Sequence, residues 1–167
     1  MWLTGRIKLI LEPFPDKKDI PIFIDEGSMG GGVVDELEAE GYNIVPINFG
    51  WSPLDPYHYY DWGTEMFATL GKHFKEGLIS IPNDPLLKAQ LWTRTKAFWR
   101  RKSGKYGFVL KMLSKDEFSK HPEFRGIKSP DRADALALAF SEYPPLNKDQ
   151  AEEFVGGSIP IMGATVK

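Results

Sequence analysis

The stretch IPIFIDEGSMGGGVVDELEAEGYNIVPINFG, residues 20–50, decides the fold class of this chain. Its first part, IPIFID, is a short run of β-branched and aromatic residues that predicts a buried strand over 20–25. The apolar residues of VVDELEAEGY then recur at helical spacing, and Gly41 suits the end of that helix. NIVPINFG predicts a second strand. A strand, a helix and a strand within about thirty residues indicate a βαβ unit with parallel strands, and therefore an α/β protein.

The rest of the chain predicts further elements around this unit. Asp84 and Pro85 are a strong helix start, and Ser129 and Pro130 repeat the same N-cap and N1 pattern. Residues 2–11 fit either a short helix or a strand. The remaining predictions are a loop at 51–61, a helix at 62–76 closed by Gly77, a strand at 78–82, a helix from Asp84 through 99, a basic turn at 100–105, a strand at 106–113, a charged connection at 114–126 and a helix at 129–140.

Composition limits the class of protein. The chain has 167 residues, of which 42% are hydrophobic and 26% charged, so we expect one globular domain over 1–145 and an irregular tail over 146–167. Cysteine is absent, which excludes disulfides, thiolate metal sites and cysteine nucleophiles. No apolar run approaches the ~18 residues of a membrane span, and the first residues do not have the pattern of a secretory signal, so we expect an intracellular protein that does not contact a membrane. The net charge of −2 argues against coating of nucleic acid over the whole surface, but it leaves room for a local basic patch.

Asp25 is the sharpest single candidate for chemistry. It ends the predicted strand at 20–25, and sites in open α/β sheets lie beyond the carboxyl ends of the strands. A carboxylate at that position is suited to hold a metal ion. The plainer alternative is that Asp25 caps the glycine-rich turn that follows it.

Asp131 and Asp134 form a second acidic group. Their i, i+3 spacing puts both on one face of the helix at 129–140. Stabilising the helix dipole would explain Asp131 but suits Asp134 less well, because small and apolar neighbours surround Asp134 and a buried charge needs a partner. A divalent cation is one such partner, since Mg²⁺ and Mn²⁺ prefer carboxylate oxygens and two such ions can flank a phosphodiester during hydrolysis.

Two further segments could bind phosphate. Basic and aromatic residues interleave over 92–106, which is suited to a nucleic-acid backbone and to stacking of a splayed base, although a solvated helix end would look similar. The glycine-rich turn GSMGGG could hold an anion, which keeps a nucleotide-binding domain open as a rival, but it fits neither a P-loop nor the dinucleotide fingerprint and is more simply a tight turn. The candidate DNA-binding residues are Arg94, Lys96, Arg100, Arg101, Lys102 and Lys105, joined by Lys115 and Lys128.

Together these segments resemble a known family. IFIDEGSMGGGVVDELEAEGYNIVPINFG, LISIPNDPLLKAQL, SKDEF and KSPDRADALALAF, in this order, resemble the C-terminal nuclease domain of phage terminase large subunits over residues 20–142. The resemblance implies an RNase H-like fold, a mixed sheet flanked by helices. It implies metal-dependent endonuclease activity on double-stranded DNA during genome packaging, in the cytoplasm of a bacterial host cell. Asp25 and an acid of the last helix would bind two Mg²⁺ or Mn²⁺ ions, with Asp131 of the SPD triplet favoured over Asp134. Lys128 stands where some relatives carry a histidine beside the metal.

The chain also departs from the family pattern. Family domains begin with a strand that carries another essential aspartate, and nothing before Ile20 matches it. We therefore expect a domain without its first strands, with an exposed sheet edge that favours homo-oligomers. The expected partners are the terminase ATPase domain, the small terminase subunit and the portal. The alternative is a catalytically silent DNA-binding or assembly module that keeps the fold and lacks the first-strand ligand.

Overall fold

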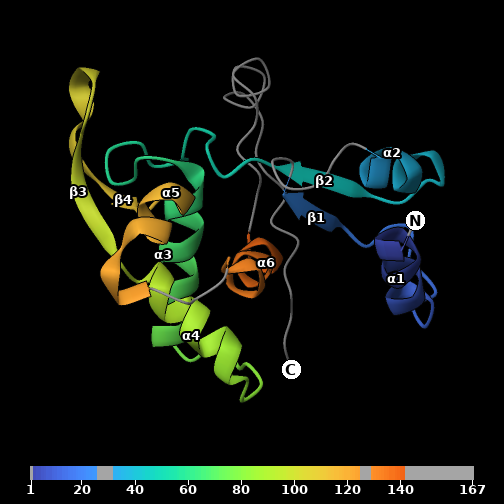
Figure 1. Cartoon of the computed structure of the whole chain (residues 1–167). Helices are drawn as coiled ribbons and strands as arrows, with labels where there is room; N and C mark the ends of the chain where they lie inside the picture. Colours follow the sequence, from blue (N-terminus) through green and yellow to red (C-terminus); the bar gives the residue numbers. More distant parts are fainter. Residues whose placement is uncertain (1, 26–31, 125–128, 142–167) are drawn as a thin grey trace.

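The computed structural model describes residues 2–25, 32–124 and 129–141, apart from the side chains of Lys105 and Lys115. This part of the chain is a mixed α/β structure in which helices and short strands alternate (Figure 1). The elements are α1 (Trp2–Leu11), β1 (Ile22–Asp25), α2 (Gly32–Ala39), β2 (Ile44–Ile47), α3 (Trp62–Lys75), α4 (Pro85–Arg94), β3 (Ala97–Lys102), β4 (Gly107–Met112), α5 (Lys115–Lys120) and α6 (Asp131–Ala139), with short 3-10 turns at Gly104–Tyr106 and Pro122–Phe124.

The βαβ unit that the sequence predicts is confirmed. β1 and β2 pair in parallel, with Ile22 opposite Ile44 and Asp25 opposite Ile47. Gly41 follows α2 with a φ of 76°, a left-handed conformation that glycine adopts without strain, and the chain turns there into β2.

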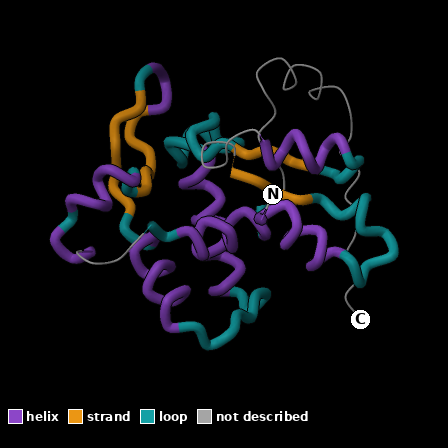
Figure 2. Tube along the Cα trace, turned by 45° about the vertical axis from the view of Figure 1, so that its right-hand side comes forward, coloured by secondary structure: helices purple, strands orange, loops and turns teal. Residues whose placement is uncertain are grey.

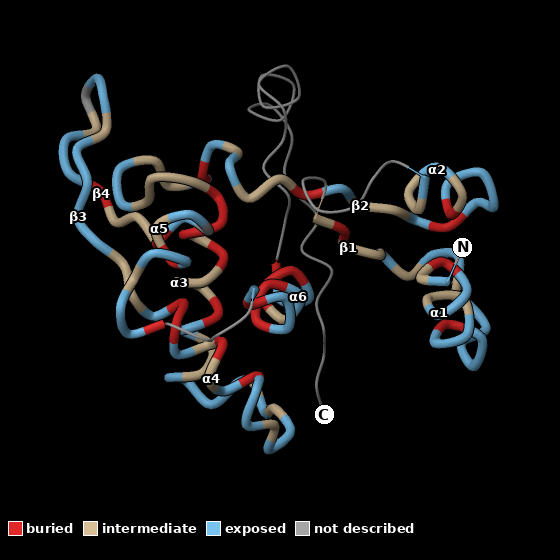
Figure 3. Tube along the Cα trace, in the orientation of Figure 1, coloured by how far each residue is buried: buried red, intermediate tan, exposed pale blue. Residues whose placement is uncertain are grey.

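The two faces of the β1–β2 sheet pack against different helices. Because strand side chains alternate, Ile24 lies on one face and packs with Leu11 of α1 and Leu37 of α2. Phe23 lies on the other face, where it packs against the main core. That core joins Ile47 to residues of α3 and α6, namely Trp62, Met66, Leu70, Ala137 and Leu138. In Figure 3 the red, buried segments of α3 and α6 follow this core, and α6 lies between the β1–β2 sheet and α3 (Figure 1).

The second sheet is an antiparallel hairpin of β3 and β4. It stands apart from β1 and β2, as Figure 2 shows, so the described residues form two small sheets where the sequence analysis expected a single mixed sheet. The free edge of β4 bridges to Tyr59, whose neighbour Tyr60 donates its N–H to the carbonyl oxygen of Leu110 at 2.9 Å. Elements of the hairpin therefore attach to the loop before α3 rather than to β1.

Three local predictions are wrong. For two of them, at residues 97–102 and 114–126, the sequence does contain a signal for the structure that forms. The helix that starts at Asp84 ends at Arg94, and residues 97–102 form β3, in line with the aromatic side chains of that segment. Residues 78–82 form no strand, because no described segment pairs with them. The charged connection at 114–126 contains α5, which starts with a capping box of Ser114 and Glu117. Residues 2–11, which the sequence left open, form a helix.

None of the helices within the described residues has both the length and the apolar composition that crossing a membrane requires. The expected tail at 146–167 and most of the GSMGGG turn lie outside the described residues.

Candidate functional site

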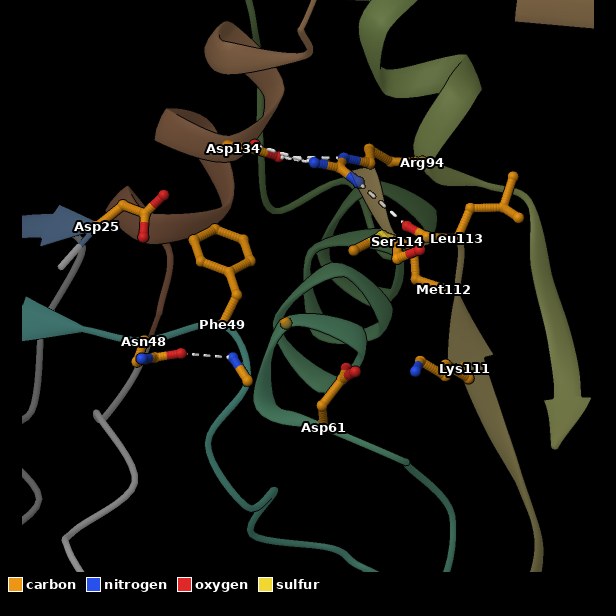
Figure 4. A pocket seen from close by; sticks show the side chains of 12 residues that line it. Asp25, Asn48, Phe49, Asp61, Arg94, Lys111, Met112, Leu113, Ser114 and Asp134 are labelled. Carbon is orange, nitrogen blue, oxygen red and sulfur yellow. Dashed lines mark hydrogen bonds and ion pairs between the residues drawn. The ribbon is translucent and has the colours of Figure 1, made fainter. Parts of the chain in front are cut away.

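Asp25 faces α6. It ends β1 on the same side of the sheet as Phe23, two residues earlier, and that side packs against the core formed with α3 and α6. The side chain is half-buried, and Figure 4 shows its carboxylate at the tip of the strand, pointing toward α6 and Phe49. Asp25 therefore directs its carboxylate toward α6, the helix that carries the other two candidate acids, Asp131 and Asp134.

The N-terminus of α6 is capped by a side chain from another helix. Gln90 of α4 is 4% exposed, and its carbonyl oxygen accepts the N–H groups of Arg132 at 2.9 Å and Ala133 at 3.3 Å. Its amide nitrogen donates to the carbonyl oxygen of Ser129 at 3.1 Å. We expected Ser129 to be the N-cap, but Pro130 occupies that position and the Ser129 hydroxyl instead donates to the carboxylate of Asp131.

Asp134 is held by Arg94 of α4. Nε of Arg94 donates to Oδ1 at 3.0 Å, and Nη2 donates to Oδ1 at 2.7 Å and to Oδ2 at 2.9 Å. The two side chains are only 5% and 10% exposed. A buried Asp134 was expected to need a partner, such as a divalent cation, and in this structure the guanidinium of Arg94 is that partner.

Asp25 and Asp134 line one pocket from opposite sides (Figure 4). This central pocket has a volume of about 300 Å³ and receives Phe49 and Asn48 from the end of β2. Lys111 of β4 and Asp61, the N-cap of α3, lie across from them. Asp61 is engaged locally, because it accepts the backbone N–H of Thr64 at 2.9 Å and the hydroxyl of Thr64 at 2.5 Å.

A second depression, which we name the β1-edge groove, has a volume of about 880 Å³. All four residues of β1 line it. Because strand side chains alternate between the two faces of a sheet, a groove on one face alone would not contact all four residues. The groove therefore follows the edge of β1 that is not paired with β2. Apolar residues of α1, including Ile7 and Ile10, form one wall. The other wall belongs to α6 and includes Asp131 and Asp134, so all three candidate acids line this groove.

The three acids do not form a complete metal site. Within the ranges that the structure describes, no three His, Asp or Glu side chains lie close enough to hold one ion. The residues present fit a divalent cation only in part. Asp25 and Asp131 line the same groove and offer carboxylate oxygens, whereas both carboxylate oxygens of Asp134 already accept hydrogen bonds from Arg94. Of the two acids on α6, Asp131 is therefore better suited to meet an ion.

Most of the described basic candidates have partners inside the protein. Arg94 is 7% exposed and turned inward to Asp134, so it is not part of a basic surface. Lys96 pairs with Glu123 at 3.1 Å, and Arg100 pairs with Glu117 of α5. Nζ of Lys102 donates to the carbonyl oxygen of Tyr60 at 2.7 Å, and burial lowers its pKa. Arg101 is exposed; Lys128 and the side chains of Lys105 and Lys115 lie outside the described residues.

Sequence reasoning missed two residues that shape this site. Gln90 gave no local signal, because its role depends on a helix that lies some forty positions later in the chain. Asp61 had a signal, since an aspartate three residues before Thr64 and at the start of an amphipathic segment is typical of an N-cap. The three histidines of the chain, His58, His73 and His121, do not line either depression.

Comparison of the chain with protein-family models, with curated proteins and with solved structures finds no match.

Proposed function

We propose that this chain is a metal-dependent endonuclease domain of the RNase H-like type, related to the nuclease domain of terminase large subunits and acting on double-stranded DNA. The observation that carries the proposal is that Asp25, at the end of β1, and Asp131 and Asp134, on α6, line one groove although more than a hundred residues separate them. Carboxylates that face one groove from a strand end and from a helix are suited to hold metal ions for phosphodiester chemistry.

The three acids would have different roles. Asp25 and Asp131 would hold Mg²⁺ or Mn²⁺, and an ion bound there would activate water and neutralise charge on the phosphate. Asp134 would act mainly through Arg94, by fixing α6 against α4, and would reach a second ion only if the guanidinium moved away. Arg101, Lys105, Lys115 and Lys128 remain candidates for contact with DNA phosphates. A terminase ATPase domain, a small subunit and a portal are the partners that this function implies.

Plasmid nicking tests the proposal directly. Supercoiled plasmid is incubated with the protein and Mn²⁺, beside Asp25→Asn and Asp131→Asn variants and a chelator control. We expect nicking by the original protein and a loss of at least about 100-fold in each variant, because removal of a metal ligand misplaces the ion. Thermal unfolding with and without Mn²⁺ gives a second readout, since an ion bound by Asp25 and Asp131 stabilises the folded protein. Nicking that persists in both variants would refute the assignment.

The β1-edge groove favours a second function, assembly without catalysis. Parallel strands are normally covered on both sides and paired along their edges, and a sheet of two parallel strands is small. Among the described residues only β2 pairs with β1, and an apolar groove along the other edge of β1 suits the addition of a strand from a second copy of the chain. A protein that assembles through this groove but neither binds Mn²⁺ nor nicks plasmid would be the silent module.

A further inference from the structure

The two faces of the β3–β4 hairpin differ in burial near its turn. Val109, on the inner face, is completely buried, and its opposite neighbour Arg100 pairs with Glu117 of α5. The outer face carries Trp99 and Phe108, and each of these aromatic side chains is 67% exposed. In Figure 1 the hairpin extends along one side of the molecule and its turn reaches past the neighbouring helices.

The outer face groups its aromatic residues around a cation. Arg101 lies directly opposite Phe108 in the antiparallel register, and Trp99 lies two residues before Arg101 on the same face. Trp99 and Phe108 are therefore diagonal neighbours, about 7–8 Å apart at the backbone. That separation is about twice the 3.4 Å spacing of successive nucleotides, so the two residues are spaced suitably for stacking of bases.

The charges of the hairpin favour a negatively charged ligand. Residues 97–112 contain five basic residues and no acidic one. Within the described part of the chain, Arg101 has no acidic partner, in contrast to Lys96 and Arg100. A cation without an acidic partner among the described residues thus lies beside two exposed aromatic residues.

We propose that Trp99, Arg101 and Phe108 form a binding platform for single-stranded DNA. This inference rests on the proposed function in taking DNA as the ligand, but it concerns a surface that the candidate acids do not share. Aromatic rings stack only on bases that are out of a duplex, and stacking of this kind is tolerant of sequence. A duplex would instead need a row of free cations, and the protein already engages Lys96, Arg100 and Lys102.

Binding without cleavage tests the platform. Fluorescence anisotropy is measured with labelled oligothymidylate of about 12 nucleotides and with a duplex of the same length, in the presence of a chelator. We expect tighter binding of the single strand. Trp99→Ala and Phe108→Ala should each weaken that binding by about 5- to 150-fold, because each removes a stacking surface. Arg101→Ala should lower the slope of log Kd against log salt concentration by about 0.7, the value for one phosphate on a single strand.

Two variants control for fold and for surface aromatics in general. Trp99→Phe retains a ring and should bind like the original protein, whereas Trp2→Ala removes a 79% exposed tryptophan from α1 and should have no effect. Equal or tighter binding of the duplex, unchanged binding by Trp99→Ala, or tighter binding of oligouridylate than of oligothymidylate would overturn the inference. An absence of any nucleic-acid binding would also overturn it and would direct the search toward a protein partner.

The two proposals fail separately. Loss of single-strand preference with intact, Mn²⁺-dependent plasmid nicking overturns the platform alone. Single-strand binding that depends on Trp99 in a protein that never nicks DNA overturns the endonuclease alone.

Discussion

Nη2 of Arg94 lies 2.7 Å from Oδ1 and 2.9 Å from Oδ2 of Asp134, so one guanidinium nitrogen bridges both carboxylate oxygens. The pair joins α4 to α6 across forty positions of sequence, and α4 also supplies Asp84, which pairs with Arg132, and Gln90. Three contacts along one helix thus fix the orientation of the helix that carries Asp131 and Asp134.

The buried pair should be strongly coupled. Asp134→Leu or Arg94→Met leaves one buried charge without its partner, and we expect each to lower the free energy of unfolding by about 3–5 kcal/mol. The double variant should lose much less than the sum, because two apolar side chains replace a pair whose desolvation was costly. Urea unfolding of the four proteins measures the coupling. Additive losses would mean that the two side chains do not depend on each other.

The cap from Gln90 should show a clear difference between two substitutions. Gln90→Leu removes the acceptor for the N–H groups of Arg132 and Ala133, and we expect a loss of about 0.5–2 kcal/mol in the free energy of unfolding. Gln90→Glu, measured at a pH low enough to protonate the carboxyl group, retains a carbonyl acceptor for these N–H groups and an O–H donor for the carbonyl oxygen of Ser129, so its loss should be smaller. Equal losses in urea unfolding would contradict a capping role.

Glu65 should give the protein a characteristic dependence on pH. Burial raises the pKa of its carboxyl above the ordinary 4.5, although the N–H groups of Leu54 and Asp55 donate to it. The folded protein therefore keeps a proton that the unfolded chain releases, and this contribution to stability falls as the pH rises from 4.5 to the raised pKa. Glu65→Gln should remove that decline. Unfolding curves at closely spaced pH values, compared between the two proteins, provide the measurement; identical profiles would exclude Glu65 as the cause.

If the β1-edge groove binds a second copy of the chain, self-association should depend on the side chains of α1 that line the groove. Ile10 lines the groove and is 63% exposed, whereas its neighbour Leu9 is 61% exposed but does not line the groove. We expect sedimentation velocity to show association that rises with protein concentration, that Ile10→Lys abolishes and that Leu9→Lys preserves. A monomer at all concentrations, or the same effect from both variants, would argue against assembly through the groove.

Local patterns account for what the sequence predicted well. The β1–α2–β2 unit lies within one short stretch with clear turn signals, and Asp84 with Pro85 marked the start of α4. The end of α4 was missed because no glycine or proline separates Arg94 from β3, and the pairing of β3 with β4 decides its structure. Asp25, Asp131 and Asp134, which the sequence suggested as one site, line one groove, but the pairing of Asp134 with Arg94 was not foreseen, because it joins residues that no sequence period relates.

The cap that Gln90 provides has a consequence for any ligand of the site. Since α4 holds the first turn of α6 through its backbone, Asp131 stands on a support that is already rigid before a ligand arrives. If a cation binds there, as the proposed function requires, it would meet a carboxylate on an anchored helix and would have less ordering entropy to offset. An amide side chain that does not touch the ligand would then help to set its affinity.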